Sequence, residues 1–226
     1  MSAAPLRTLV VGCGQMGSSH ARAYHRMPEF DIVGLVSRGE ASRSILNREF
    51  GGRYAEFDDY ERALASTAPE AVCISTYTET HADYAVAATG AGAHVFLEKP
   101  VAATIDEAER VIDAARRRQR ALVVGYILQV HPAWQQFTEV ARTLGKPLVM
   151  RMNLNQQSAG RAWAVHKNLL ASTSPIVDCG VHYVDVMCQV TGAKPVRVHA
   201  VGARLTTEVH ERMYNYGHLH VSFDDG

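Results

Sequence analysis

The feature that most constrains this chain is the nine-residue stretch LVVGCGQMG, which runs from Leu9 to Gly17. An apolar run of the kind found in a buried strand comes first, and three glycines follow at Gly12, Gly14 and Gly17 before helical spacing begins. In a dinucleotide-binding turn the first glycine allows the sharp turn, the second admits a pyrophosphate, and the third lets the helix pack on the strand. The same glycines also occur in ordinary loops, but the flanking strand and helix favour a phosphate-binding turn at a helix N-terminus.

Length and charge limit the possible partners. The chain has 226 residues, enough for one domain and part of a second, and 23 basic residues balance 23 acidic ones. No net charge recruits nucleic acid or an anionic membrane, so small molecules or protein chains are the expected partners. No apolar window is long enough for a membrane span and no signal peptide is evident, which predicts a cytoplasmic protein. The four cysteines lack metal-ligand spacing, so we expect reduced, mostly buried thiols and no metal.

The second strand, expected at Phe30–Val36, bears on the choice of cofactor. An NAD-binding fold usually has an acidic residue at the carboxyl end of this strand, but Asp31 lies at the opposite end. Ser37 and Arg38 stand at the carboxyl end instead, and a hydroxyl beside a guanidinium suits a 2′-phosphate. This predicts NADP as the preferred cofactor, with NAD as the second choice. The alternative is that Arg38 is a solvated loop residue.

Two further strand ends carry polar residues. After a strand at 71–75, Thr76 and His81 either border the cofactor, or a nearby threonine caps a helix and His81 lies on the surface. After a strand at 93–97 comes Glu98-Lys99-Pro100, placed where packing alone explains it poorly and where a cis proline can hold the turn. The residues expected to bind the cofactor are Gly12, Gly14, Gln15, Met16, Gly17, Ser37, Arg38, Thr76, His81 and Glu98.

The domain organisation follows from a change in pattern. Alternating strands and helices fill the first part, which predicts an α/β Rossmann domain with a doubly wound parallel sheet over residues 1–125. Residues 126–226 predict an α+β domain with a mixed or antiparallel sheet for substrate binding and oligomerisation, incomplete at its C-terminus. Its expected elements are helices at 131–144 and 176–190, strands at 147–155, 196–205 and 214–223, and an aperiodic segment at 156–173.

A second group of chemical residues lies in the expected helix at 176–190. Asp178, His182 and Asp185 follow at spacings of four and three, which places them on one helical face. This face admits three interpretations: a metal site without an evident fourth ligand, a satisfied structural network, or a catalytic site with His182 as general acid or base. The third is favoured because a buried stripe of ionisable groups is costly without a use.

Taken together, GCGQMG at 12–17, EKP at 98–100 and DCGVH at 178–182 resemble the Gfo/Idh/MocA family of nicotinamide-dependent oxidoreductases over nearly the whole chain. The resemblance implies a sugar, cyclitol or related substrate and a homo-oligomer formed through the C-terminal sheet. It also implies that Lys99 contacts substrate and cofactor, that His182 transfers the proton, and that Asp178 binds substrate and orients the site.

The expected reaction is hydride transfer between nicotinamide and a secondary alcohol or ketone, with Lys99 stabilising the developing alkoxide. Further substrate contacts are expected from Tyr126, Trp163 and Lys167, although the last two are equally well explained as exposed loop residues. Two departures from the family pattern, at 127–129 and 172–175, concern substrate identity more than reaction type. The alternatives are a redox-neutral glycosidase or epimerase that uses the cofactor transiently, and a non-catalytic NADP-binding or scaffold protein.

Overall fold

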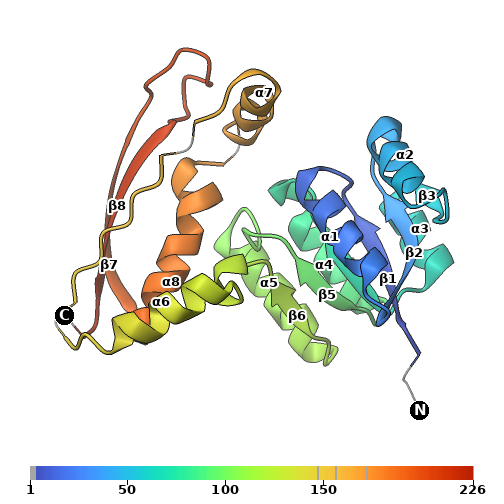
Figure 1. Ribbon diagram of the computed structural model, residues 1–226, viewed down its shortest axis with the longest axis horizontal. Coiled ribbons are helices and arrows are strands. Elements are labelled where there is room, and N and C mark those ends of the chain that lie inside the picture. Colours follow the sequence, from blue (N-terminus) through green and yellow to red (C-terminus); the bar gives the residue numbers. More distant parts are fainter. Residues whose placement is uncertain (1–3, 147, 156, 172, 226) are drawn as a thin grey trace. The chain divides into compact units, whose positions relative to one another are not determined.

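The computed structural model describes residues 4–146, 148–155, 157–171 and 173–225, and the chain forms two compact units, Met1–Gly125 and Tyr126–Gly226. Pro147, Gln156 and Ser172, which belong to segments discussed above, lie outside the described residues. Each unit is described by itself, with the element labels of Figure 1.

The first unit contains a six-stranded parallel sheet in the order β3-β2-β1-β4-β5-β6. This confirms the predicted doubly wound sheet, and β1 beside β4 is the point where the strand order reverses. The very short β3 was not predicted, because two residues carry no periodic signal. The strands are β1 (Leu6–Val11), β2 (Phe30–Val36), β3 (Glu56–Phe57), β4 (Ala71–Ile74), β5 (His94–Leu97) and β6 (Leu122–Val124).

Helices connect these strands in the alternating order that the sequence predicts (Figure 1). Their starts follow local chemistry: the Asp59 side chain accepts from the backbone of Arg62, and Thr104 and Glu107 form the predicted reciprocal capping box. The helices are α1 (Gln15–Arg26), α2 (Glu40–Glu49), α3 (Tyr60–Thr67), the short 3₁₀ turn η1 (Thr78–Thr80), α4 (His81–Gly90) and α5 (Ile105–Arg117).

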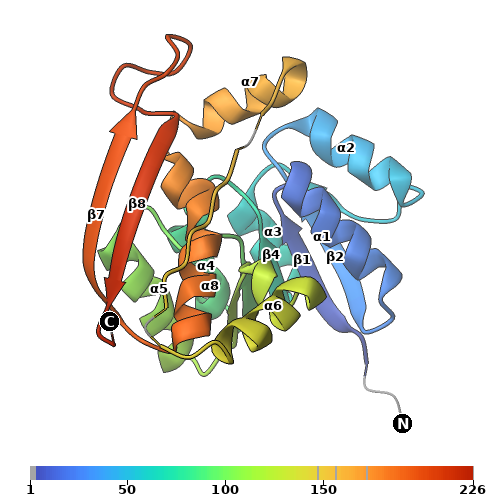
Figure 2. The ribbon, with the colours of Figure 1, turned by 60° about the vertical axis from the view of Figure 1, so that its left-hand side comes forward.

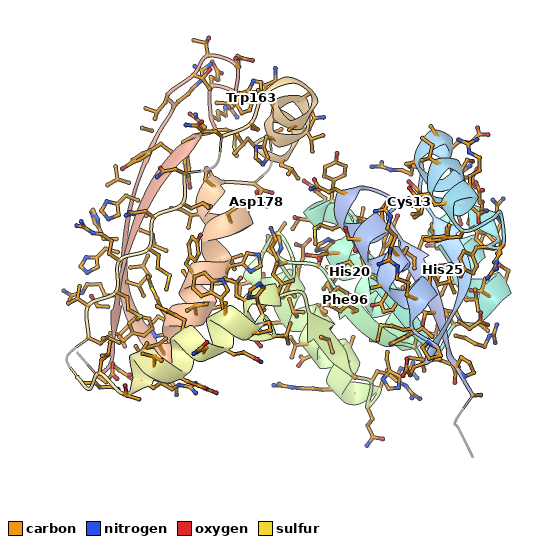
Figure 3. All side chains as sticks on the ribbon, in the orientation of Figure 1. Cys13, His20, His25, Phe96, Trp163 and Asp178 are labelled. Atoms are coloured by element: carbon orange, nitrogen blue, oxygen red, sulfur yellow. The ribbon has the colours of Figure 1, made fainter. Side chains whose placement is uncertain are left out.

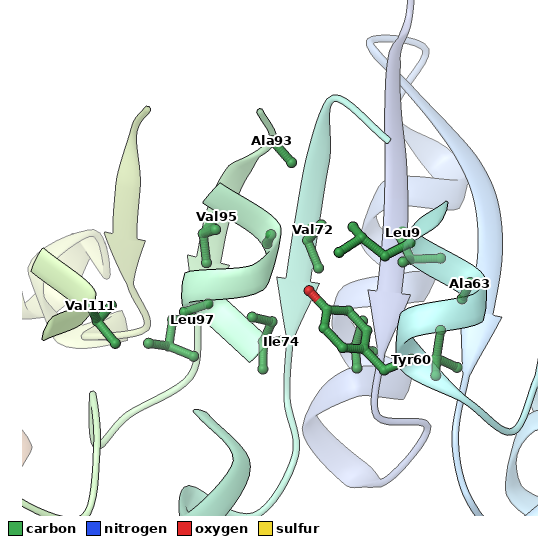
Figure 4. Close-up of a cluster of buried hydrophobic side chains, with 14 of the residues drawn as sticks. Leu9, Tyr60, Ala63, Val72, Ile74, Ala93, Val95, Leu97 and Val111 are labelled. Atoms are coloured by element: carbon green, nitrogen blue, oxygen red, sulfur yellow. The ribbon is translucent and has the colours of Figure 1, made fainter. Parts of the chain in front are cut away.

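Both faces of this sheet are buried, which explains the unbroken apolar runs in its strands. Leu9 and Val11 point to one cluster with side chains from β4 and β5, whereas Val10 points to the opposite cluster with Leu35 and Leu46. Figure 4 shows Leu9, Val72 and Val95 projecting from three neighbouring strands into the first cluster. The sheet is therefore a rigid platform for the loops at its carboxyl edge.

The second unit combines helices with a two-stranded antiparallel sheet, as the α+β prediction requires. Its small core contains Ala141, Val186 and Val190. Figure 2 shows β7 and β8 as a long ribbon, in which Val198 pairs with Val221. The elements are η2 (Ile127–Gln129), α6 (Pro132–Arg142), α7 (Gly160–Leu169), the π-helical turn η3 (Ile176–Gly180), α8 (Val181–Thr191), β7 (Pro195–Ala203) and β8 (Tyr216–Phe223).

Two expectations for this unit are wrong. Residues 148–155 do not form a strand. Their side chains do alternate, because Leu148, Met150 and Met152 pack on the small core while Val149 is 94% exposed. The described part of the chain, however, provides no neighbouring strand with which this segment could form a ladder of hydrogen bonds. The segment at 156–173, expected to be aperiodic, contains helix α7. Its apolar residues are mostly consecutive, at 162–165, so they mark no helical period.

No helix in the described part of the chain combines the length and apolar character that crossing a bilayer requires.

Candidate active site

The glycine-rich turn after β1 lies at the reversal of strand order, as predicted. Gly12 has a φ of +97°, and a Cβ on it would lie 2.2 Å from the backbone oxygen of Ser75, which follows β4. A Cβ on Gly17 would lie 1.8 Å from the backbone oxygen of Gly12. Neither position can carry a side chain without moving backbone, so α1 packs against the turn at close range.

Gly14 differs from the other two glycines, because nothing lies within 4 Å of the Cβ it lacks. It is the N-cap of α1, and Gly14, Gln15 and Met16 are exposed. The first hydrogen bond of α1 is made by the Ser18 amide, which donates to the backbone oxygen of Gly14 at 2.9 Å. The N–H groups that precede Ser18 in the first turn make no hydrogen bond within the helix. We call this open turn at Gly14, Gln15 and Met16 the cradle, and it fits the pyrophosphate of a dinucleotide.

Two guanidinium groups follow the carboxyl end of β2, one in the loop at Arg38 and one in α2 at Arg43. Ser37 is half-buried and Arg38 is exposed, whereas Asp31 lies at the far end of the strand as expected. Sequence reasoning missed Arg43, whose Nη1 donates to the backbone oxygen of Ser37 at 2.6 Å and whose Nε lies 3.6 Å from Glu56. Arg43 therefore fixes the loop that presents Arg38.

His81 is buried, with 1% of its surface exposed, so the surface alternative is excluded. Its Nδ1 lies 2.7 Å from the backbone oxygen of Pro100 and its Nε2 lies 3.2 Å from that of Thr76. Burial lowers the pKa of this imidazole, and the two carbonyls oppose that shift. Thr80 is the N-cap of α4, but its hydroxyl contacts the Thr76 hydroxyl at 2.7 Å instead of capping the helix.

The turn after β5 holds Glu98 and Lys99, followed by a cis Lys99–Pro100 peptide bond as anticipated. Glu98 is buried, and its Oε1 lies 2.7 Å from Nε2 of His20 on α1. Lys99 is half-buried, and its backbone N–H donates to Oε2 of Glu98 at 3.2 Å. Sequence reasoning missed His20, although it stands three residues after the last glycine of the motif.

In the second unit, Asp178 lies in the π-helical turn η3, so the α-helical spacing argument does not extend from Asp178 to His182. The hydroxyl of Ser174, two residues before this turn, accepts from the Val177 amide at 3.2 Å, and Cys179 donates its thiol to Asp178 at 3.4 Å. Irregular helical turns of this kind concentrate at functional sites.

His182 is the second residue of α8, and its ring lies edge-on to that of Tyr126 at 6.3 Å between centroids. Asp185 has a structural place, because its two oxygens accept from the side-chain amides of Gln129 and Gln189, each at 2.8 Å. The network interpretation therefore accounts for Asp185. Within the described ranges no group of three or more His, Cys, Asp or Glu side chains could hold a metal ion.

A pocket of about 700 Å³ lies within the second unit, and Asp178 and Trp163 both line it (Figure 3). Glu208, which sequence reasoning missed, accepts from the Trp163 indole at 2.8 Å and from Lys167 at 3.0 Å. These two donors lower the pKa of the Glu208 carboxyl. His166 also lines the pocket, with Nδ1 2.8 Å from the Ser158 hydroxyl. A cavity with one aromatic wall and several polar groups suits a small polyhydroxylated ligand.

Comparison with known proteins agrees with this arrangement. Residues 6–126 match an oxidoreductase family model with an NAD-binding Rossmann fold, and residues 140–226 match the GFO/IDH/MocA C-terminal domain. The chain belongs to the Gfo/Idh/MocA family. This family binds NAD(P) in its Rossmann domain, in accordance with the open cradle at the N-terminus of α1.

Curated relatives of this family member include dehydrogenases. It is 30% identical over 203 residues to UDP-N-acetylglucosamine 3-dehydrogenase of Acidithiobacillus ferrooxidans, covering 90% of this chain and 60% of the relative. It is 26% identical over 211 residues to inositol 2-dehydrogenase of Paracoccus denitrificans, covering 92% and 61%. A solved structure of the Acidithiobacillus enzyme superposes with a TM-score of 0.76 at 26% identity, over 98% of this chain and 67% of that one. The chain thus spans about three fifths of the length of these curated relatives.

Proposed function

We propose that the protein catalyses hydride transfer between NADP or NAD and a secondary alcohol or ketone of a sugar, cyclitol or related molecule. The observation that carries this proposal is the open glycine cradle at the reversal of strand order, with Lys99 at the carboxyl end of a strand of the same sheet. Ligands of such sheets bind beyond the carboxyl ends of the strands. The named activities of the relatives point to the same chemistry.

Each residue has a defined task in this proposal. When bound, the nicotinamide accepts or donates the hydride. His182 removes the proton from the substrate hydroxyl, or returns it in the reverse direction, because imidazole titrates near neutral pH. The Lys99 ammonium supplies positive charge where the alkoxide develops, and Asp178 accepts a hydrogen bond from a substrate hydroxyl. Tyr126, Trp163 and Lys167 complete the substrate contacts.

The test is turnover with NADP⁺ over a panel of sugars, glycosides and cyclitols. We expect Lys99→Met and His182→Asn each to lower kcat by at least about 100-fold, with cofactor binding retained. Lys146→Met and His131→Asn are the matched controls, because both side chains are exposed and lie outside the proposed site.

If both residues serve one reaction, the double variant loses little more than the worse single variant, since effects within one catalytic unit are not additive. Full activity of either single variant contradicts the assignment. Product formation without net change in nicotinamide absorbance would instead indicate redox-neutral use of the cofactor.

We further propose that NADP is preferred over NAD. Arg38 is exposed after β2, Arg43 is anchored beside it, and the acidic residue of β2 lies at the other end of the strand. Arg38→Ala should weaken NADP⁺ binding by about tenfold and NAD⁺ binding by less than about twofold. Arg53→Ala, in a different exposed loop, is the control. Equal losses for the two cofactors would contradict the preference.

Self-association through the β7–β8 sheet is also proposed. Val196 and Val198 are 63% and 61% exposed on β7, and apolar surface of this kind favours contact with another chain. Val198→Lys should shift the molar mass measured by light scattering toward the monomer. Ile45→Lys, which changes an exposed apolar residue of α2, should leave the mass unchanged.

A further inference from the structure

The two residues that flank Lys99 are each held by a histidine from a different helix. On one side, the His20 ring contacts the Glu98 carboxylate, with 2.7 Å between Nε2 and Oε1. Both side chains are largely buried, at 18% and 7% exposed. The His20 ring also packs on Phe96 of β5, with 4.7 Å between ring centroids, so its orientation is fixed by a second contact (Figure 3).

The Glu98 carboxylate lies in a slot that a glycine keeps open. A Cβ on Gly125 would lie 3.0 Å from Oε2 of Glu98 and 3.2 Å from Oε1, closer than ordinary contact permits. Gly125 itself is held to the sheet, because its amide donates to the backbone oxygen of Leu97 at 2.8 Å. The remaining Glu98 oxygen accepts from the Lys99 amide. The carboxylate thus connects α1, the sheet and the Lys99 backbone.

On the other side, His81 holds Pro100. The Nδ1–oxygen distance to Pro100 is 2.7 Å, and the second ring nitrogen faces Thr76, which follows β4. Burial lowers the pKa of His81, and the shorter of its two contacts, to the Pro100 carbonyl, favours a proton on Nδ1. The Pro100 carbonyl therefore accepts a hydrogen bond from the His81 ring.

We propose that His20 and His81 are positioning residues that together fix the backbone of Lys99. The inference rests on the proposed role of Lys99. A lysine has a long, flexible stem, so the position of its ammonium depends on where its backbone is anchored. Misplacing a reacting group by about 1 Å costs about 100-fold in rate. We call the contacts of His20 with Glu98 and of His81 with Pro100 the histidine brace. Because His20 lies on α1, whose N-terminus forms the cradle, the brace also connects the proposed cofactor-binding helix to the Lys99 turn.

The test compares variants of His20 with a matched histidine on the same helix. We expect His20→Ala to lower kcat by about 10- to 100-fold while KM and the Kd for NADP⁺ change by less than about threefold. His20→Gln should recover part of kcat, because its amide can donate to Glu98. His81→Gln, which keeps one donor for Pro100, should show a smaller loss of kcat than His20→Ala. His25→Ala is the control, since His25 bonds to Tyr54 and packs on Phe50 instead.

A second readout does not depend on activity. The chain has four lysines, so ¹³C reductive methylation gives a spectrum in which the Lys99 signal is assigned by its loss in Lys99→Arg. We expect the Lys99 signal to shift or broaden in His20→Ala and to stay in place in His25→Ala. If kcat and the Lys99 signal are unchanged while only the melting temperature falls, His20 is merely structural and the proposal is overturned.

The two proposals fail in distinguishable ways. If Lys99→Met retains full activity but the Lys99 signal responds to His20→Ala, the brace stands and the catalytic role of Lys99 is wrong. If the Lys99 signal is the same in His20→Ala as in the unaltered protein while Lys99→Met is inactive, the catalytic role of Lys99 stands and the proposed brace is wrong.

Discussion

The two units of this chain differ in how firmly their chemical residues are held. In the first, strands buried on both faces present the glycine turn, and buried side chains such as Glu98 and His81 meet their partners within 3.2 Å. In the second, Asp178 and Trp163 line a pocket on a scaffold whose core is small and whose longer strands are exposed. The first unit therefore holds its polar side chains on a closely packed sheet, whereas the second holds them on a scaffold with a smaller core and more exposed strands.

The reactivity of the cysteines gives the largest expected contrast between the units. Burial raises the pKa of the Cys13 and Cys73 thiols to about 12, so at pH 8 their thiolate fraction is about 1000-fold below that of an ordinary cysteine. Cys179 and Cys188 in the second unit are only partly buried. Mass spectrometry after brief native alkylation should find label on Cys179 and Cys188 first. Early labelling of Cys13 or Cys73 would mean that the first unit opens readily.

The glycine turn should show the next largest effect. Gly17→Ala forces a Cβ against the Gly12 carbonyl and should both lower the melting temperature and weaken NADP⁺ binding by more than about 100-fold. Gly14→Ala meets no protein atom, so it should weaken binding while leaving the melting temperature unchanged. Gly90→Ala, in helix α4 with open space around its Cβ position, is the control for both measurements. Normal cofactor binding by Gly17→Ala would refute the close-packed turn.

This difference between units also governs what the sequence alone predicts. In the first unit, every strand except the two-residue β3 is marked by an apolar run in the sequence, and Gly12, Gly14 and Gly17 stand in the order that the turn requires. In the second unit, Leu148, Met150 and Met152 alternate as a strand would, but no ladder partner follows from sequence. Local pattern predicts an element only when its tertiary neighbours agree with it.

The candidate site residues divide by whether a pattern within one element marks them. Lys99 and Ser37 are candidates from the sequence because they follow buried strands at the edge where ligands of such sheets bind. His20, Arg43 and Glu208 could not, because their importance comes from partners distant in sequence: Glu98 is 78 residues from His20, and Trp163 is 45 residues from Glu208. A spacing rule reaches only along one element, whereas these contacts cross between elements.

Truncating one buried valine in each unit measures the packing difference directly. Val72 and Val186 are each 1% exposed. We expect Val72→Ala to cost about 2 to 3 kcal/mol of unfolding free energy, because the sheet around it cannot collapse into the cavity, and Val186→Ala about 1 kcal/mol. Urea denaturation followed by probes in each unit provides the measurement. Equal costs would show that the second unit is packed as tightly as the first.

The smallest expected effect is the pH dependence due to His81. Because burial lowers its folded-state pKa below the ordinary value near 6.5, the unfolded chain binds a proton at pH values where the folded chain does not. Its contribution to stability is therefore complete above about pH 6.5 and is lost as the pH falls toward the folded-state pKa. The urea midpoint of His81→Gln should fall less steeply between pH 7.5 and 5.5 than that of the unaltered protein. Parallel slopes would contradict a buried neutral imidazole.

Gly125 has a consequence for protein engineering. It is the last residue of the first unit, and the carboxylate of Glu98 occupies the space beside it. A chimera that joins this Rossmann unit to the second unit of another family member should therefore place its crossover after position 125. A junction that brought in a bulkier residue there would press on Glu98, so the last residue before the joint packs against the Lys99 turn and cannot be treated as a spacer.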